Sequence, residues 1–373
     1  MLNYSKLIAA LERQASDIFF HSPISYTLLQ ETWDYITHNE SFVQRLQHAI
    51  IPWPIPRWQH KLDATHTIET YAKPYTILSV DGSQIYPDRH MGISCYMINI
   101  GTMVIPYQLP LVPLIMESEP YIFTHAEAIG ESHASISIVN AQRLELELQQ
   151  GYSTAMRIKS IAPHEPLLLL FDGSLIFWHL DDEHIKELFF VRYCTILQQL
   201  YDAGIICAWY ISMPRTRDLM QLIKLALSDF NINNKEAYQM IEHYTDAALM
   251  QMHLSPNTYS TVFEHTGLLY MEYPAHVRPH FVYMHVGDEI ARVEFPAWIV
   301  QDTTICTRLM QMVFDQVIKG QGYPVALAEA HEQAVIKGPD REFFYTTIEK
   351  IGLRYNQKPM MSRKSFRKKY TLF

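Results

Sequence analysis

Two identical tripeptides hold the residues that are best suited to chemistry in this sequence. Asp81-Gly82-Ser83 follows the apolar run Thr76–Val80, and Asp172-Gly173-Ser174 follows the apolar run Leu167–Phe171. A carboxylate at the end of an apolar strand lies at the edge of a sheet, where sites form. Two unpaired carboxylates held close together repel each other, so a divalent cation is their natural partner. One Asp-Gly-Ser is more simply a turn, but two copies in these positions favour a metal site.

A third acid is expected from the helix predicted over Ser135–Lys159. Glu145 and Glu147 both border the apolar stripe that includes Leu148, so helical periodicity does not separate them. The alternative is a solvated face on which Arg143 pairs with Glu147 at a spacing of i, i+4. That alternative holds for at least one of the two glutamates.

The fourth candidate ligand is His331, in the helical sequence AEAHEQA. It lies four residues after Leu327 and four before Val335, so it shares a helix face with apolar residues. A lone histidine on such a face is more often a core residue. We nevertheless consider it a metal ligand, because Gly322-Tyr323-Pro324 introduces its helix. The other histidines show no HExxH or comparable spacing.

The elements that must position these residues alternate in an informative order. Three strands, a helix, a strand, a helix, a strand and a helix are predicted over Thr76–Val80, Gly92–Gly101, Thr102–Met116, Ser135–Lys159, Leu167–Phe171, Glu183–Ala203, Ile205–Ile211 and Arg215–Leu227. This is the element order of the RNase H-like fold, an α/β fold with a mixed sheet. The uncharged stretch Met91–Met116 is long enough to cross a bilayer, but prolines interrupt it, so we expect strands and no membrane span.

The flanking segments complete the expected organisation. Residues 1–70 are predicted to form an N-terminal helical layer, and residues 71–352 the RNase H-like domain, with a helical insertion near 230–280. After this insertion we predict a hairpin and three helices, over Phe281–His285, Glu289–Phe295, Thr303–Ile318, Val325–Ile336 and Arg341–Ile351. Residues 353–373 form a basic tail.

The net charge and the cysteine content limit which classes of protein the sequence can represent. The formal net charge is −9, which gives no general nucleic-acid signal, but the chain ends in a basic segment that includes Arg363, Lys364, Arg367, Lys368 and Lys369. We expect this tail to contact DNA; the alternative is a solubilising end. The four cysteines form no CxxC pair, which predicts free thiols in a reducing, cytoplasmic compartment. There is no Gly-rich nucleotide-binding loop.

The chain resembles the NurA family of nucleases. The matching pieces are ILSVDGSQIYPDRH, RLELEL, LLLLFDGSL, YISMPRTRDL, RVEFP and GYPVALAEAHEQAVI, which span about residues 76 to 345 in the family's order. The resemblance implies a manganese-dependent, RNase H-like nuclease that acts on DNA ends with a hexameric HerA-type helicase and usually forms dimers. Its metal ligands would be Asp81, Glu147, Asp172 and His331, with Glu147 chosen because the family's Arg-x-x-x-Glu spacing begins at Arg143.

These ligands suit a two-metal hydrolysis of phosphodiesters, with cations about 4 Å apart. Asp81 would bridge the cations, and His331 would favour Mn²⁺ over Mg²⁺ because Mg²⁺ prefers oxygen ligands. Arg215 and Arg217, at the predicted helix start, are candidates for gripping DNA phosphates, and Arg89 is a weaker one. A non-catalytic adaptor for a helicase and a phosphohydrolase acting on small molecules remain alternatives.

Overall fold

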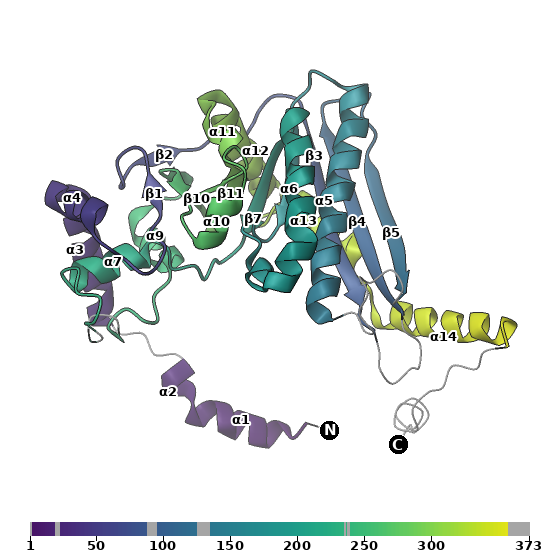
Figure 1. The fold of residues 1–373 in the computed structure, drawn as a ribbon, viewed down its shortest axis with the longest axis horizontal. Helices are drawn as coiled ribbons and strands as arrows, with labels where there is room; N and C mark the ends of the chain where they lie inside the picture. The colour runs from purple at the N-terminus through teal and green to yellow at the C-terminus, as the bar shows by residue number, and fades with distance from the viewer. Residues whose placement is uncertain are drawn as a thin grey trace.

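A large mixed sheet forms the centre of the molecule (Figure 1). The computed structural model describes residues 2–18, 23–87, 95–124, 135–234, 236 and 239–356. Within these residues the sheet has 11 strands, and its main path runs β1-β9-β10-β11-β7-β6-β3-β4-β5. The strands are β1 Arg57–Trp58, β2 Thr65–Thr67, β3 Tyr75–Ile85, β4 Cys95–Tyr107, β5 Ile115–Thr124, β6 Leu167–Asp172, β7 Ile206–Ile211, β8 Thr258–Ser260, β9 Phe263–Glu264, β10 Pro279–Val286 and β11 Glu289–Pro296.

Five of these strands form the RNase H-like core that the element order predicts. β3, β4 and β5 make an antiparallel meander, and β6 and β7 add parallel strands on the other side of β3. The crossover helices are α5 (Ile136–Ile161) and α6 (Glu183–Asp202), which pack side by side against the sheet (Figure 1). β6 is buried along Leu167–Phe171, as an apolar run in a strand covered on both faces should be.

Two helices from the C-terminal half of the chain lie on the other face of the sheet. α13 (Val325–Ala334) packs on β3 and β4, and α12 (Thr303–Lys319) packs on α13. The other helices are α1 Tyr4–Arg13, α2 Ala15–Ile18, α3 Pro23–His38, α4 Glu40–His48, α7 Met220–Leu227, α9 Asp246–His253, α10 Leu268–Glu272, α11 Ala297–Val300 and α14 Gly338–Arg354. No helix in the described ranges is long and apolar enough to cross a membrane.

Two predicted strand boundaries are wrong. The predicted break between Gly101 and Thr102 lies inside β4, and the third strand is β5, which starts at Ile115. Gly101 indicated an end of a strand, but it serves a close approach: a Cβ there would lie 2.4 Å from the backbone oxygen of Ala330 and the backbone nitrogen of Ala334. β5 was missed because its outer residues are exposed and include Glu117 and Glu119, so it does not form an apolar run.

Two segments expected to be helical contain short strands. In the described residues of the N-terminal segment, helices extend as far as His48, after which β1 and β2 form. The expected helical insertion contains β8 and β9. β1 pairs with β9, and β2 pairs with β8. Each strand is only two or three residues long, so neither segment shows an alternating pattern by itself. The hairpin is confirmed as β10 and β11, and it joins the core sheet through β11 and β7.

Candidate active site

Asp81 and Asp172 lie next to each other on neighbouring strands. β3 and β6 are parallel, and Val80 pairs with Phe171, so the next residue on each strand is an aspartate on the same face. The identical tripeptides nevertheless differ in local structure. β6 ends at Asp172, and Gly173 turns the chain with a φ of 92°. Asp81 does not end its strand as predicted, because β4 continues to pair with β3 as far as Ile85.

His331 reaches Asp81 from α13. Gly101 pairs directly with Asp81 in the β3–β4 ladder, and its lack of a side chain makes room there for the backbone of α13. Ser83 Oγ and Asn99 Nδ2 both donate hydrogen bonds to the carbonyl oxygen of Ala334, at the end of this helix. As a result His331 Nδ1 lies 2.8 Å from Asp81 Oδ2.

The environment of His331 contradicts the view that it is a core histidine. Its side chain is 62% exposed, whereas Leu327 on the same helix is buried. Because the His331 side chain is exposed and bonded to Asp81, it is accessible to a cation at the candidate site. Its role as a metal ligand remains a prediction.

Glu147 approaches from the opposite face of the sheet, where α5 lies. The space next to β3 is provided by Gly82, where a Cβ would lie 2.5 Å from Glu147 Oε1 and 2.8 Å from Arg143 Cγ. Arg143 Nη1 donates to the carbonyl oxygen of Gly82 at 2.8 Å and lies 3.2 Å from Glu147 Oε1. The predicted Arg143–Glu147 pair is therefore present, but at the candidate site and not on a solvated helix face.

The Glu147 carboxylate is buried and incompletely satisfied. Among the described residues Oε1 has no hydrogen-bond partner, since the nearby Arg143 nitrogen forms an ion pair without hydrogen-bond geometry. Burial raises the pKa of Glu147 to about 7, the Arg143 guanidinium opposes this shift, and the charges of Asp81 and Asp172 add to it. A divalent cation would offset both the burial and the repulsion.

Glu145, the other helical candidate, faces a different neighbour. Arg192 on α6 donates to Glu145 Oε2 at 3.0 Å, and Gln149 donates to Oε1 at 3.2 Å. Oε2 is therefore used in the contact between α5 and α6, and Oε1 in a hydrogen bond within α5. The geometry favours Glu147 as the helical ligand.

Tyr323 is a site residue that sequence reasoning missed. Its hydroxyl donates a hydrogen bond to Asp172 Oδ1 at 3.1 Å. Loss of surrounding water raises the pKa of Asp172, the Tyr323 hydrogen bond lowers it, and the charge of Asp81 raises it. The available signal was the Gly322-Tyr323-Pro324 turn, because a turn directly before a helix that carries a ligand can present its own side chain to the site.

The four candidate ligands are of types that bind a divalent cation, but their side chains are not arranged around a common coordination position. Three carboxylates and an imidazole are suitable ligands for manganese, and the unpaired buried Oε1 of Glu147 is an unused donor. In the described part of the chain no three His, Cys, Asp or Glu side chains are grouped closely enough to hold a metal. Asp81 and His331 instead bond to each other through Oδ2 and Nδ1, so His331 would offer Nε2 to a cation while this contact is kept.

The two arginines predicted to grip phosphate are placed differently from expectation. α7 begins at Met220, so Arg215 and Arg217 do not start a helix. The Asp246 carboxylate performs the capping, accepting from the backbone amides of Asp218 at 2.6 Å and Met220 at 2.9 Å. This long-range cap could not be read from the local sequence.

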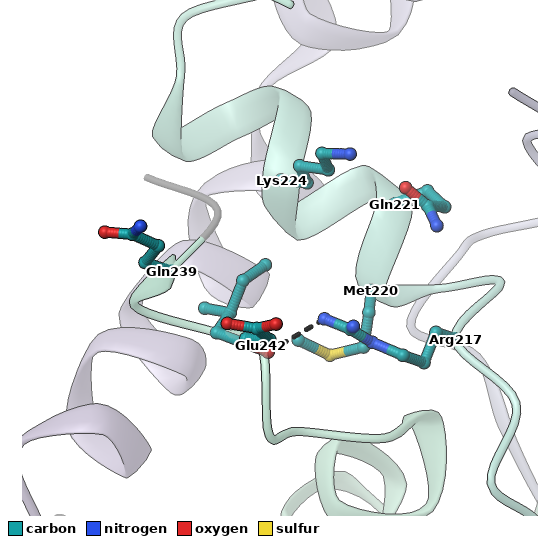
Figure 2. A pocket seen from close by; sticks show the side chains of 7 residues that line it. Arg217, Met220, Gln221, Lys224, Gln239 and Glu242 are labelled. Carbon is teal, nitrogen blue, oxygen red and sulfur yellow. Dashed lines mark hydrogen bonds between the residues drawn. The ribbon is translucent and has the colours of Figure 1, made fainter. Parts of the chain in front are cut away.

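Arg217 turns toward a separate pocket. Its Nη2 donates to the carbonyl oxygen of Ile241 at 2.9 Å, and it lines a cavity of about 350 Å³ together with Gln221, Lys224 and Glu242 (Figure 2). In the described ranges neither Arg215 nor Arg217 bonds to the four candidate ligands. Arg89 and the tail residues Arg363, Lys364, Arg367, Lys368 and Lys369 lie outside the described residues.

The fold and the clustered acids define an RNase H-like protein with a candidate metal site. A comparison with protein families matches the NurA domain to residues 75–336, a range that contains all four candidate ligands. The chain belongs to the NurA family, a nuclease family associated with DNA end processing.

The other comparisons add little. None of the curated proteins matches the chain. Among solved structures it is similar to Argonaute from Aquifex aeolicus, with 10% identity and a TM-score of 0.27, over 70% of this chain and 28% of that one. The chain thus spans little more than a quarter of that protein's length, and a similarity this low supports no argument about function.

Proposed function

We propose that this protein is a manganese-dependent DNA nuclease that hydrolyses phosphodiester bonds at DNA ends. The observation that carries the proposal is the convergence of Asp81, Asp172, Glu147 and His331 from two strands and two helices that are far apart in sequence. Family membership supports the nuclease class. Manganese, and not only magnesium, is proposed because His331 offers nitrogen to the cation.

Each candidate ligand would have a different role in such a site. When bound, two cations would activate water and relieve charge on the leaving oxygen. Asp81 is central, since it neighbours Asp172 on β6 and bonds to His331 on α13, and it would bridge the two cations. Asp172 and Glu147 would each hold one of them, and His331 would complete the second position. Tyr323 orients the carboxylate of Asp172.

Arg143 has a defined part in this arrangement. It is anchored on the carbonyl oxygen of Gly82 and holds a positive charge beside Glu147. This charge stabilises the ionised form of the buried carboxylate, which is the form that binds a cation. Arg143 is therefore expected to support cation binding without being a ligand.

The wider setting is also part of the proposal. We propose that the protein acts in the cytoplasm as a homodimer with a HerA-type hexameric helicase, in DNA double-strand-break repair and end resection, and that the basic tail contacts DNA. These points rest on the family resemblance and on the charge of residues 353–373. A non-catalytic helicase adaptor and a small-molecule phosphohydrolase are the alternatives to be excluded.

Cleavage of labelled single- and double-stranded DNA, with Mn²⁺, with Mg²⁺ and with chelator, tests the proposal. The variants Glu147→Gln and Glu145→Gln form a matched pair, because they lie on the same helix but only Glu147 lies beside the aspartates. We expect Glu147→Gln to lose cleavage and Glu145→Gln to retain it. Absence of metal-dependent cleavage would favour the adaptor, and hydrolysis of small phosphate esters alone would favour the phosphohydrolase.

A further inference from the structure

The loop that follows Asp172 is held by a buried carboxylate from a different part of the sheet. Glu294 on β11 is 1% exposed, and its Oε2 accepts hydrogen bonds from Ser174 Oγ at 2.7 Å and from the amide of Leu175 at 2.8 Å. The amide of Ile176 lies 3.4 Å from the same oxygen. A single carboxylate oxygen thus fixes the residues directly after the Asp172-Gly173 turn.

The path of the loop explains how it reaches β11. β7 lies between β6 and β11 in the sheet. The Gly173 amide donates to the carbonyl oxygen of Tyr210 on β7 at 3.0 Å, and the next residue, Ser174, reaches Glu294. Gly173 permits this sharp turn because its φ is 92°. The loop therefore crosses the end of β7 before it bonds to β11.

The other oxygen of Glu294 is held by a buried arginine. Arg292 has no exposed surface, and its Nε donates to Glu294 Oε1 at 2.7 Å. Its guanidinium also bonds to Asp218 Oδ2 and Tyr283 Oη and stacks on the Phe281 ring at 3.6 Å. The Arg292 side chain is thus held on several sides, and it fixes the orientation of the Glu294 carboxylate.

Stability alone does not explain such a buried pair. Replacing a buried ion pair with apolar residues is often neutral or stabilising, because the ions lose their hydration. A buried pair can instead specify one arrangement of the chain. Here the arrangement that it specifies is the position of the loop that begins at Asp172, one residue beyond the end of the parallel pairing between β3 and β6.

We propose that Glu294, oriented by Arg292, is a positioning residue that presents Asp172 to the metal site through Ser174 and the backbone of the loop. This inference rests on the proposed function, because it assumes that Asp172 binds a cation. Partners of ligating carboxylates commonly change metal affinity about 10- to 100-fold when they are removed. Glu294 differs from such a partner in acting through the loop and not through the ligand itself.

The test uses the full-length protein and Mn²⁺ alone. Ser174→Ala removes a hydroxyl that bonds to Glu294, Ser174→Thr restores one, and Glu294→Gln removes one of the two carboxylate charges that pair with Arg292. Ser212→Ala is the matched control, since its Oγ donates to Glu289 of β11 at 3.0 Å without touching the loop. Mn²⁺ affinity by calorimetry and amide hydrogen exchange of residues 174–177 in metal-free protein are measured for each variant.

We expect Ser174→Ala to weaken Mn²⁺ binding about tenfold and to speed exchange in the loop, with both effects reversed in Ser174→Thr and absent in Ser212→Ala. Unchanged Mn²⁺ affinity in a folded Ser174→Ala protein would overturn the inference even if Glu294→Gln fails to fold. Unchanged exchange in the loop would overturn it as well. Asp172→Asn distinguishes a failure of the proposed metal site from a failure of the positioning role of Glu294. If that variant binds Mn²⁺ as tightly as the wild type, the proposed metal site is itself wrong, and this inference falls with it.

Discussion

Gly101 lies directly opposite Asp81 in the β3–β4 ladder, and it is the residue that allows α13 to approach Asp81. A side chain at this position would meet the backbone of α13, at 2.4 Å from the Ala330 oxygen and the Ala334 nitrogen. Backbone atoms in a helix cannot move aside individually. The position of His331 therefore depends on a residue that has no functional group.

This relationship predicts that Gly101→Ala displaces α13. We expect a loss of unfolding free energy of about 1–3 kcal/mol, typical of overpacking, and a larger relative loss of DNA cleavage, because His331 moves away from Asp81. Urea denaturation and a cleavage assay measure the two effects. Gly338→Ala is the control, since a Cβ there meets no described atom within 4 Å. Normal cleavage by Gly101→Ala would show that the position of α13 is not critical.

Asp81→Asn and Asp172→Asn should each lower DNA cleavage by about 100-fold or more, because each removes a charge that the cations require. Metal-free stability should stay level or rise, since removing one carboxylate relieves the repulsion that the carboxylates exert on one another. Thermal unfolding in chelator and cleavage in Mn²⁺ check the two statements. Near-normal cleavage by either variant would contradict the proposed site.

His331→Ala should lose most cleavage with both Mn²⁺ and Mg²⁺, and His331→Asp should regain part of it with Mg²⁺, because Mg²⁺ prefers oxygen ligands. Folding should be little affected, since the side chain is 62% exposed. Rates in each metal measure the outcome. Glu332→Ala, on the same helix as His331, removes an exposed side chain that pairs with Lys337, and it should cut DNA normally if His331 is the ligand. If His331→Ala cuts DNA normally, the fourth ligand must be sought at Glu329 or Glu332.

His179 should make the fold sensitive to acid. Its Nε2 lies 3.1 Å from the Tyr193 hydroxyl, which donates to the carbonyl oxygen of Ala141, so the neutral ring must act as donor. Burial lowers the pKa of His179 to about 4, and the charge of Arg143 adds to this shift. The unfolded chain, with a histidine pKa of about 6.5, therefore binds the proton first, and stability falls as pH drops through that value.

The measurement is urea denaturation of His179→Gln and wild type at pH 7.5 and pH 5. Glutamine does not titrate, so the variant should lose on the order of 1 kcal/mol less stability than the wild type over this range, after allowance for solvent screening. The exposed His164→Gln is the control and should keep the wild-type pH dependence. Equal pH dependence in His179→Gln and wild type would contradict the prediction.

The core fold could be predicted because its elements are long and periodic. The apolar run Leu167–Phe171 indicates a buried strand, and the apolar residues at helical spacing in α5 indicate a helix. The two aspartates could be selected for the same reason, since each directly follows an apolar strand segment. Their neighbourhood then followed from the order of the elements.

The remaining features depend on contacts between distant segments. Whether Glu145 or Glu147 faces the site is decided by Arg192 on another helix. The start of α7 is decided by Asp246, 26 residues beyond the Met220 amide that it caps. Likewise, β1 and β2 exist because β9 and β8 pair with them. None of these partners can be identified from local spacing.

The exposed strand β5 has a consequence for solubility. In the part of the chain that the structure describes, β5 pairs only with β4, so its outer side offers unpaired backbone groups on which another strand could add. Glu117 and Glu119 are exposed on this strand, and Pro120 lacks an amide hydrogen. Charges and proline on an edge strand oppose its pairing with a strand of another molecule. The composition that hid β5 from a search for apolar strands thus protects the protein against edge-to-edge aggregation.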